Sequence, residues 1–459
     1  RLAWLGGWRG GLGGEFHLVV LGVDGGSGGG ETLGVPELAA RALAVARCSC
    51  SDLWWVALAS NAKTPDSKLR MGLAGLGAAS TQILRALDGY DNIVVTAACD
   101  VREDALEAFR ATRPGLTFSS VEEMAASEEV DAVYVATPNY LHCEHVLQAV
   151  AHGKDVIVEK PIAVSLEECD RMIKAAAAAG VRVLAGHTHS FDAPIAAMAK
   201  LIHEDGLVGD LYMLHNANYT DWMYRGRVPD ELDTPRGGGV VFRQGPHGID
   251  VIRQLAGQRA TRVTARTSQL DPQHPTHGSY TALIEFGPRV VATVTFSGYS
   301  FFDSAELLWG RGELGCPRPL ATNSENRRRV LGFKTAEEET AYKNSVRFTG
   351  PEAENWLAVL DCDEEIRTHP FYGLTIVSGS KGDLRQSEHG LYFYGNDGRV
   401  EIPVAKAALE REAELDVLYK AWRDGVPLPG HDAVWARDTL EICLAVIESS
   451  DTGRAVDLQ

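Results

Sequence analysis

A glycine turn between an apolar run and an amphipathic run constrains this chain more than any other feature of its sequence. Residues 72–80 read Gly-Leu-Ala-Gly-Leu-Gly-Ala-Ala-Ser, between a predicted strand at 69–73 and a predicted helix at 80–87. This is a G-x-G-x-x-G frame with Ser80 in the place of the third glycine, where a small side chain still lets helix and strand pack closely. Such a turn brings a diphosphate to the backbone amides at the positive end of the helix. The sequence therefore predicts dinucleotide binding, and not a plain turn, by Gly75, Gly77, Ala78 and Ala79.

A carboxylate ends the next predicted strand, at 93–99. Asp100 lies 23 residues after Gly77, where it can accept hydrogen bonds from a ribose 2′-hydroxyl and repel a 2′-phosphate. This position favours NAD over NADP. Two alternatives remain open, because Asp100 could instead cap the helix predicted at 102–112 and Arg102 could bind a 2′-phosphate.

Strands and amphipathic helices alternate between residues 69 and 185, which is typical of a parallel sheet covered by helices on both faces. After residue 206 strand-like runs dominate and short turns join them, which indicates an antiparallel sheet. We therefore predict an α/β protein with a Rossmann-type doubly wound parallel sheet at 67–187 and an α+β domain at 188–459. The polar stretch 311–351 is expected to be a long insertion or lid-like loop. Further helices are expected at 248–255, 407–424 and 432–449.

Residues 1–66 differ in composition from the rest of the chain. They hold glycine-rich runs and four of the nine tryptophans, and no methionine occurs before Met71. We expect this segment to be a disordered or non-native extension. The alternatives are a genuine domain and a targeting peptide with its apolar run at 53–62.

The charge and cysteine content exclude several classes of partner. A balance of 44 basic and 62 acidic residues gives a net charge of −18, which repels phosphate backbones and anionic lipid. No apolar run is long enough to span a bilayer, so we expect neither nucleic acid nor membrane as a partner. The eight cysteines are scattered, unlike the framework of a small secreted domain, and we expect a reducing cytoplasm. The close pair Cys48 and Cys50 lacks a second pair at metal-ligand spacing, so no metal is expected.

Polar residues follow the next two predicted strands, at 132–136 and 155–158. In open α/β sheets ligands gather beyond the carboxyl ends of the strands, so these residues are site candidates. A lysine at the edge of a nicotinamide pocket can bind a substrate hydroxyl and stabilise its alkoxide, although a lone lysine would more often pair with a surface carboxylate. The candidates are Thr137, Asn139 and His142 after the first strand, and Glu159 and Lys160 after the second.

These motifs together resemble a known family. The glycine frame, Thr137-Pro138-Asn139 with His142, and Glu159-Lys160-Pro161 look like the glucose-fructose oxidoreductase, inositol dehydrogenase and MocA (Gfo/Idh/MocA) family, over roughly residues 67–459. The resemblance implies a Rossmann domain that binds NAD and a second domain with a large open, mostly antiparallel sheet. It also implies a homodimer or homotetramer, and a catalytic role for Lys160.

The family's second site motif is Asp-x-Gly-x-His-x-x-Asp at the start of a helix. Residues 243–250 read Arg-Gln-Gly-Pro-His-Gly-Ile-Asp, so His247 and Asp250 match while Arg243 replaces the first aspartate. The resemblance implies that His247 is the general acid/base. A pKa near neutrality would suit it to take a hydroxyl proton as hydride leaves the same carbon. Without that context, a histidine at a helix start is more often a cap or packing residue.

Arginines crowd the segment before this motif, at 225, 227, 236 and 243. Arginine forks bind carboxylates in bidentate fashion, although any one of these residues could be a solvated loop residue. Segments 186–192, 241–247, 296–299 and 371–378 resemble phthalate 4,5-cis-dihydrodiol dehydrogenases and related dehydrogenases of carboxylated cyclohexadiene diols. The histidines at 187 and 189 could form a metal pair, but pocket lining is favoured because no third ligand has matching spacing. The expected substrate-binding residues are Arg225, Arg236, Arg243, Gln244, His187 and His189.

The predicted function is NAD-dependent oxidation of a carboxylated cis-dihydrodiol to the matching catechol. The replacement of the aspartate by Arg243 argues against a sugar or polyol dehydrogenase, which is the nearest rival function. An NAD-dependent glycosidase and a non-catalytic NAD-binding regulator also stay open, because a fold alone does not fix a function.

Overall fold

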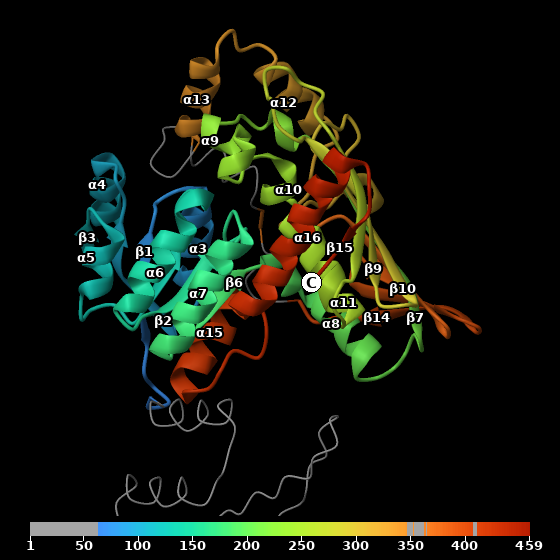
Figure 1. The fold of residues 1–459 in the computed structure, drawn as a ribbon, viewed down its shortest axis with the longest axis horizontal. Helices are drawn as coiled ribbons and strands as arrows, with labels where there is room; N and C mark the ends of the chain where they lie inside the picture. Colours follow the sequence, from blue (N-terminus) through green and yellow to red (C-terminus); the bar gives the residue numbers. More distant parts are fainter. Residues whose placement is uncertain (1–62, 347–351, 353–361, 364, 407–410) are drawn as a thin grey trace, which may run out of the picture. The chain divides into compact units, whose positions relative to one another are not determined.

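Two sheets organise the chain (Figure 1). The computed structural model describes residues 63–346, 352, 362–363, 365–406 and 411–459, which belong to one compact unit at 54–459. The expectations for residues 1–62, including Cys48 and Cys50, lie outside the described residues.

The first sheet has six parallel strands in the order β3-β2-β1-β4-β5-β6. Its central strands β4 and β5 are buried along their whole length, as a sheet covered on both faces requires. The strand order reverses between β1 and β4, so the carboxyl ends of these two strands open the crevice where ligands bind. The strands are β1 Leu69–Ala74, β2 Ile93–Cys99, β3 Leu116–Phe118, β4 Ala132–Val135, β5 Asp155–Glu159 and β6 Val183–Gly186. The helices are α3 Ala78–Asp88, α4 Glu103–Thr112, α5 Val121–Ala126, α6 His142–Ala151 and α7 Leu166–Ala179, with a 3-10 turn at Asn139–Leu141.

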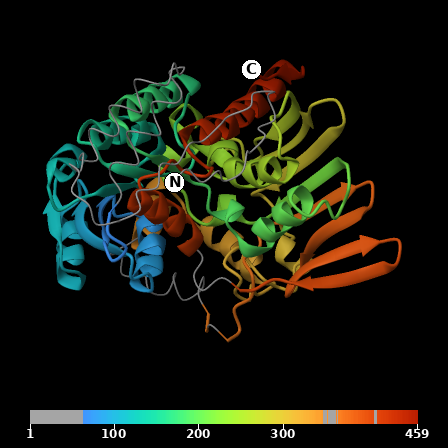
Figure 2. The ribbon, with the colours of Figure 1, turned by 90° about the horizontal axis from the view of Figure 1, so that it is seen from below.

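The second sheet has nine strands in the order β14-β13-β12-β11-β7-β10-β9-β8-β15. Only the pair of β7 with β10 is parallel among the pairings of the described residues. Every second residue of β10 is buried, the pattern of a sheet with one face against a core. Figure 2 shows β11–β14, in orange, extending from one edge of the sheet. The strands are β7 Leu211–Tyr219, β8 Arg262–Ser268, β9 Ser279–Phe286, β10 Val290–Ser297, β11 Leu374–Gly379, β12 Gly382–Ser387, β13 Gly390–Gly395, β14 Gly398–Pro403 and β15 Val456–Asp457.

Helices cover the inner face of this second sheet. The helix α16 packs along β8, and α11 packs on β7 and β10. The predicted fold class, a Rossmann-type sheet followed by a mostly antiparallel one, is confirmed. The helices of this half are α8 Ala193–His203, α9 Pro229–Leu232, α10 Gly239–Arg243, α11 Gly245–Ala256, α12 Thr322–Val330, α13 Ala336–Ser345, α15 Glu412–Asp424 and α16 Ala433–Thr452, with 3-10 turns at Thr188–Ser190, Trp222–Tyr224, Thr234–Arg236 and Ser304–Leu307.

The insertion at 311–351 is not the loop that its polar sequence suggests. Its described part, up to residue 346, contains the helices α12 and α13. Thr335 starts α13 by accepting a hydrogen bond from the amide of Glu338, which satisfies an amide that the helix itself cannot pair. A capping residue thus helps a short helix to form in the polar segment 311–346, whose apolar residues do not recur with the period of a helix.

A disulfide that the sequence did not predict closes the insertion. Cys316 and Cys362 are bonded across 46 residues of sequence, with their Cα atoms 5.7 Å apart. Pairing of this kind depends on a fold that brings distant residues together, so the spacing of the cysteines alone does not reveal it. Four further described cysteines are buried thiols: Cys99, Cys143, Cys169 and Cys443.

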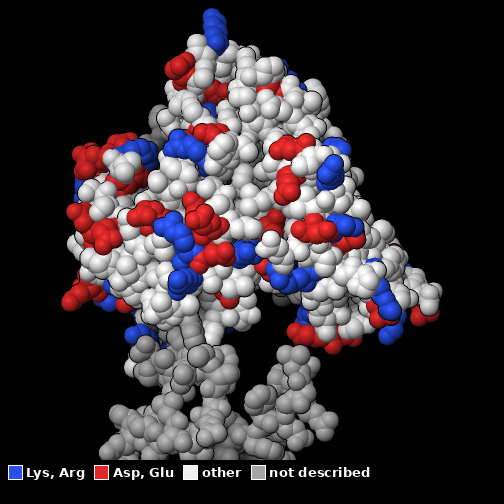
Figure 3. Space-filling view, in the orientation of Figure 1, with Lys and Arg blue, Asp and Glu red and all other residues white. Residues whose placement is uncertain are grey.

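The surface carries charges of both signs. Acidic side chains (red) crowd the end of the molecule that holds α4 and α5 in the view of Figure 3, consistent with the acidic first turns of both helices. No helix among the described residues has the length and hydropathy that crossing a bilayer requires.

A buried ion pair ties the late helix α15 back to the first sheet. The guanidinium of Arg411, at the start of α15, donates to Glu159 Oε1 over 2.6 Å and to the hydroxyl of Tyr134 over 2.9 Å. Burial alone would raise the pKa of Glu159, but the charge of Arg411 outweighs it and lowers this pKa to about 2. The apolar face of α15 enters the same core as β1. The late helix therefore packs against the first sheet.

We expect Arg411→Ala to lower the free energy of unfolding by about 3–5 kcal/mol at pH 7, because it leaves Glu159 buried without its cation. Urea denaturation measures this loss. Since the pKa of Glu159 is about 2 when folded and 4.5 ordinarily, the contribution of the pair is complete above about pH 5 and is lost as the pH falls from 4.5 towards 2. The control Arg110→Ala removes an exposed pair with Glu103 and should cost less than about 1 kcal/mol. Equal losses in the two variants would contradict the assignment.

Candidate active site

The glycine turn after β1 is shaped for close approach of a ligand. Gly75 has φ +89°, and a Cβ atom added to it would lie 2.9 Å from the carbonyl oxygen of Ala136. Gly77 precedes α3, and a Cβ atom there would meet nothing within 4 Å. No side chain caps the first turn of α3, which begins at Ala78 and Ala79. The first amides of α3 are therefore open to an anionic group such as the diphosphate of NAD.

Asp100 fastens this turn. Its Oδ2 accepts a hydrogen bond of 2.7 Å from the amide of Leu76, and its Oδ1 accepts one of 2.9 Å from the amide of Arg102. The helix α4 has Arg102 as its N-cap residue, so Asp100 is not the cap. The guanidinium of Arg102 donates to the carbonyl of Leu76 over 2.8 Å, and 40% of its side chain stays exposed. A carboxylate at the end of β2, joined to the glycine turn, fits the ribose of NAD.

Two of the predicted cofactor residues have main-chain partners instead. The ring of His142 bridges the carbonyls of Thr137 and Pro161, with Nε2 and Nδ1 at 2.9 and 2.8 Å. Asn139 donates to the carbonyl of Gly237 over 2.8 Å. Both side chains are buried, so they join the loop after β4 to the loop after β5 and to the segment before α10. Thr137 is only partly buried, and its hydroxyl lies 2.8 Å from Nδ1 of His145.

Lys160 follows β5 and reaches across to the second half of the chain. Its ammonium donates a hydrogen bond of 2.9 Å to the carbonyl oxygen of Arg243, the last residue of α10. Burial lowers the pKa of Lys160 to about 8; the charge of Glu159 opposes this effect and that of Arg243 adds to it. Glu159, which was predicted to bind the cofactor, is committed to Arg411 and Tyr134.

Three rings gather beside this lysine. The ring of His247 lies 4.7 Å from that of His189 and 4.8 Å from that of Tyr372, between centroids. The hydroxyl of Tyr372 donates to the carbonyl oxygen of Gln244 over 2.8 Å and lies 3.1 Å from its Oε1. Tyr372 was not among the predicted site residues, since it is distant in sequence and only the placement of β11 brings it here.

The electrostatics of His247 differ from the prediction. Burial lowers the pKa of His247 well below its ordinary value, and the positive charge of Lys160 lowers it further. The expected pKa near neutrality is therefore wrong, because the sequence could not reveal how deeply the ring is buried among cations. At neutral pH the imidazole is uncharged and can accept a proton.

Asp250 anchors the helix that carries His247. It accepts hydrogen bonds from Trp435 Nε1 at 2.6 Å and Thr439 Oγ1 at 2.8 Å, and also from the hydroxyl of Ser190. His187 Nδ1 lies 2.9 Å from the same carboxylate. Although burial favours the protonated form, interactions with His187 and His431 keep the pKa of Asp250 well below its ordinary value. The match of Asp250 to the family motif is thus explained by support of the site and not by direct chemistry.

The predicted pair of histidines at 187 and 189 has two different carboxylate partners. His187 lies against Asp250, while His189 Nδ1 is 2.9 Å from Asp192. No cluster of three metal-ligating side chains is found in the described part of the chain. Both histidines are buried.

The structure separates the predicted arginines. Arg225 pairs with Asp221 at 2.7 Å, and Arg236 pairs with Asp230 at 2.9 Å. Arg243 lies at the end of α10, four residues before His247, and its main chain holds Lys160. Its side chain is 22% exposed, with NH1 3.7 Å from Glu231. Of the three, Arg243 is thus the one whose main chain contacts the predicted catalytic Lys160.

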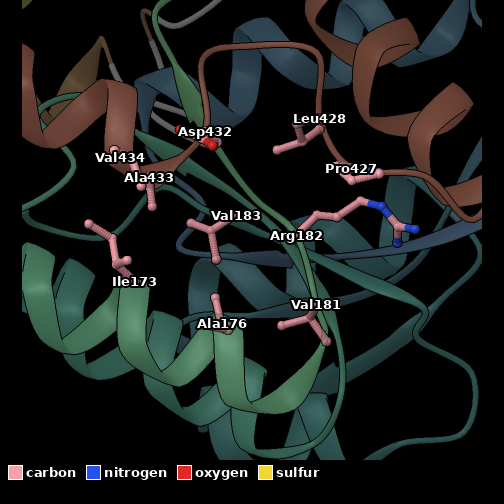
Figure 4. Close-up of a pocket in the computed structure, with 11 residues that line it drawn as sticks. Ile173, Ala176, Val181, Arg182, Val183, Pro427, Leu428, Asp432, Ala433 and Val434 are labelled. Carbon is pink, nitrogen blue, oxygen red and sulfur yellow. The ribbon is translucent and has the colours of Figure 1, made fainter. Parts of the chain in front are cut away.

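A separate cavity of about 180 Å³ lies between α7, β6 and the turn before α16 (Figure 4). Its lining is mostly apolar, with Ile173, Val181 and Val183 on one side and Leu428 and Val434 on the other. None of the candidate site residues lines it.

Comparison with known proteins covers both halves of the chain. Residues 69–187 match the oxidoreductase family with an NAD-binding Rossmann fold, and residues 195–314 match the Gfo/Idh/MocA C-terminal domain. The chain is 34% identical to the 1-carboxy-3-chloro-3,4-dihydroxycyclohexa-1,5-diene dehydrogenase of Comamonas testosteroni, over 83% of this chain and 94% of the relative. It is 29% identical to the myo-inositol 2-dehydrogenase of Thermotoga maritima, over 44% of this chain and 59% of the relative. A crystal structure of a dehydrogenase from Bordetella bronchiseptica RB50 is 37% identical and superposes with a TM-score of 0.77, over 85% of this chain and 100% of that one.

We expect Gly75→Ala to weaken NADH binding by about tenfold or more. The added Cβ atom meets the carbonyl of Ala136, and the strained φ costs about 1–3 kcal/mol, so the turn must move away from the diphosphate. Titration of NADH fluorescence measures the affinity. Gly153→Ala is the matched control, since Gly153 also has a positive φ, +69°, but has open space around it. It should lose stability yet keep its affinity for NADH; the same affinity in both variants would contradict the site.

Proposed function

Because the chain belongs to the Gfo/Idh/MocA family of NAD-binding oxidoreductases, we propose that it oxidises a carboxylated cis-dihydrodiol of a cyclohexadiene to the matching catechol. The observation that carries this proposal is the hydrogen bond from Lys160 to the main-chain carbonyl of Arg243, which ends the helix directly before the one that carries His247. The positive charge of the Arg243 guanidinium also acts on Lys160. The relative from Comamonas testosteroni, whose name specifies a carboxylated dihydroxycyclohexadiene, supports the same substrate class.

The chemistry divides between the cofactor and two side chains. Bound NAD supplies the hydride acceptor at its nicotinamide ring. Lys160, an ammonium below about pH 8, donates a hydrogen bond to the substrate oxygen and favours the alkoxide. His247, uncharged at neutral pH because burial and Lys160 lower its pKa, accepts the hydroxyl proton. The carbon loses hydride and the oxygen loses a proton, which leaves a ketone that enolises to the aromatic catechol.

Arg243 provides the substrate specificity in this proposal. A guanidinium binds a carboxylate through two parallel hydrogen bonds, which a neutral polyol cannot offer. The surrounding charge agrees, because Lys160 and Arg227 add further cations near Arg243. The remaining predicted arginines, Arg225 and Arg236, pair with aspartates and stay outside this role.

Each rival function predicts a different experimental result. A polyol dehydrogenase, as the Thermotoga maritima relative would suggest, would turn over inositol and be indifferent to loss of Arg243. An NAD-dependent glycosidase would not accumulate NADH, and an NAD-binding regulator would show no turnover. A panel of carboxylated cis-dihydrodiols, inositol and aldoses, followed by NADH absorbance, distinguishes the proposed oxidation from a polyol dehydrogenase. No NADH with any member of the panel would contradict both and favour the glycosidase or the regulator.

Assembly and location complete the proposal. On the outer face of the second sheet Met213 and Leu283 are 47% and 41% exposed. Covering this apolar face in a homodimer or homotetramer would remove it from water. We further propose a cytoplasmic location, against which the Cys316–Cys362 disulfide weighs, since disulfides persist mainly in oxidising compartments.

The dependence of kcat/KM on pH should be bell-shaped. Activity should fall above about pH 8, where Lys160 loses its proton. It should also fall at acidic pH, below the ordinary histidine pKa of 6.5, where His247 becomes charged. Lys160→Ala should reduce kcat by about 10²–10⁴-fold, and Lys160→Arg should move the alkaline limb to higher pH. A wild-type alkaline limb that is unchanged in Lys160→Arg would contradict the role of Lys160.

Arg243→Ala should raise the KM for a carboxylated cis-dihydrodiol by about tenfold to a hundredfold, the value of a hydrogen-bonded ion pair. The KM for the same diol without its carboxylate should change little. Arg262→Ala, which removes an exposed arginine on β8, controls for the loss of a positive charge. If Arg243→Ala affected both diols equally, the residue would not recognise the carboxylate, and the proposed substrate class would fail.

A further inference from the structure

We infer that Glu339, on helix α13 of the insertion, is a specificity-determining residue that positions Arg243 through Arg227 and Glu231. The inference rests on the proposed function, because it takes Arg243 as the residue that binds the substrate carboxylate. It extends that function to a segment that neither of the two family matches covers.

Glu339 is the acidic residue of α13 that turns inward. The helix starts with three successive glutamates, of which Glu337 and Glu338 are exposed while Glu339 is 8% exposed. Its Oε1 accepts a hydrogen bond of 2.7 Å from the amide of Arg227. Both of its oxygens lie within 3.0 Å of Nε2 of the buried His274. A buried carboxylate with two such partners is held in one place.

The backbone beside Arg227 is shaped to receive α13. Gly226 has φ +74°, and a Cβ atom added to it would lie 3.0 Å from Cδ1 of Tyr342 and 3.8 Å from Cβ of Lys343. Both of these residues lie on α13, one turn after Glu339. The helix is therefore seated directly on the segment that carries the arginines.

A chain of charged contacts leads from this seat to the catalytic lysine. The guanidinium of Arg227 lies 3.8 Å over the ring of Trp222, and its NH1 is 3.5 Å from Glu231 Oε1. The same oxygen of Glu231 lies 3.7 Å from NH1 of Arg243. The carbonyl of Arg243 in turn accepts the hydrogen bond from Lys160.

Arg227 and Arg243 thus share one carboxylate oxygen, Oε1 of Glu231. Because of this sharing, a shift of Arg227, which Glu339 holds, also changes the contact of Arg243. Arg227 is buried, and the charges of both Glu231 and Glu339 help to keep its guanidinium protonated against burial. Without Glu339 the amide of Arg227 loses its acceptor, so the backbone that sets the Arg227 guanidinium against Glu231 shifts and draws that carboxylate away from Arg243. The guanidinium of Arg243 then shifts relative to Lys160, and the geometry for a carboxylate is lost.

The start of the insertion reaches the same site. Glu313 Oε1 lies 3.9 Å from NH2 of Arg225, and its negative charge acts on Lys160. The insertion therefore touches the arginine segment at two places, through Glu313 and through Glu339.

The test combines single and double variants of the full chain, with steady-state kinetics on a carboxylated cis-dihydrodiol and on the diol without carboxylate. Glu339→Ala should raise the KM for the carboxylated diol by about tenfold, with kcat and the KM for NAD within about twofold of the wild type. Glu339→Gln keeps an acceptor for the amide of Arg227 and should restore part of the loss. Glu337→Ala, an exposed neighbour on the same helix, should behave as the wild type.

The double variant separates a positioning role from a merely structural one. If Glu339 acts through Arg243, then Glu339→Ala should have no further effect on KM in the Arg243→Ala background. Additive effects, or a rise in KM that is equal for both diols, would overturn the inference. A thermal unfolding temperature of Glu339→Ala far below that of Glu339→Gln would require the comparison to be made with the glutamine variant, to which the same criteria apply.

The two proposals can fail separately. If Arg243→Ala raises the KM for the carboxylated diol but Glu339→Ala and Glu339→Gln do not, the inference fails and the proposed function stands. If Arg243→Ala itself leaves that KM unchanged, the proposed function fails first, and the inference with it.

Discussion

The hydrogen bond from the ammonium of Lys160 to the carbonyl of Arg243 is the contact on which the site depends. It joins the end of β5, in the first sheet, to the junction of α10 and α11, which belongs to the second half of the chain. The cost of enclosing this ammonium appears in the lowered pKa of Lys160. Because the carbonyl belongs to the residue that ends α10, a shift of this helix moves both the lysine partner and the histidine that follows in α11. The two halves must therefore be in register for His247 and Lys160 to meet.

That contact also sets the electrostatics of the site. Burial lowers the pKa of His247 well below its ordinary value, and the positive charge of Lys160 lowers it further, so the imidazole is uncharged at neutral pH. The uncharged ring packs against its neighbours, the rings of His189 and Tyr372. Asp250 accepts hydrogen bonds from α16 and from the turn after β6, and His187 and His431 lower its pKa, so it stays ionised. The uncharged His247 thus has a cationic neighbour in Lys160, while the anion Asp250 lies on the same helix, three residues after His247.

The sequence predicted the fold well where burial repeats along the chain. The strand β2 has the predicted bounds, 93–99, and β7 and β8 lie where strand-like runs were predicted after residue 206. The strands β12 and β14 are largely polar, and pairing with neighbours forms them without a local pattern. The site followed the same rule: the glycine turn and Lys160 lie in local motifs, whereas Tyr372 and Glu339 come close only through long-range packing. Burial also changed two expectations, since it moved the pKa of His247 and gave Glu159 a structural partner in Arg411.

The exchange of an aspartate for Arg243 explains why this site needs additional acidic residues. In the family's motif the residue four positions before the histidine is an aspartate, whose negative charge can balance the positive charge of the nearby lysine. An arginine there instead adds a positive charge to one already present, and two cations in a partly buried site repel each other. Glu231 lies near the guanidinium groups of both Arg227 and Arg243, and Glu339 on the insertion accepts a hydrogen bond from the amide of Arg227. If the substrate is the proposed carboxylate, the site must hold surplus positive charge until that substrate binds. The buried carboxylates of Glu231 and Glu339 can balance that positive charge, and they do not occupy the position of the substrate carboxylate.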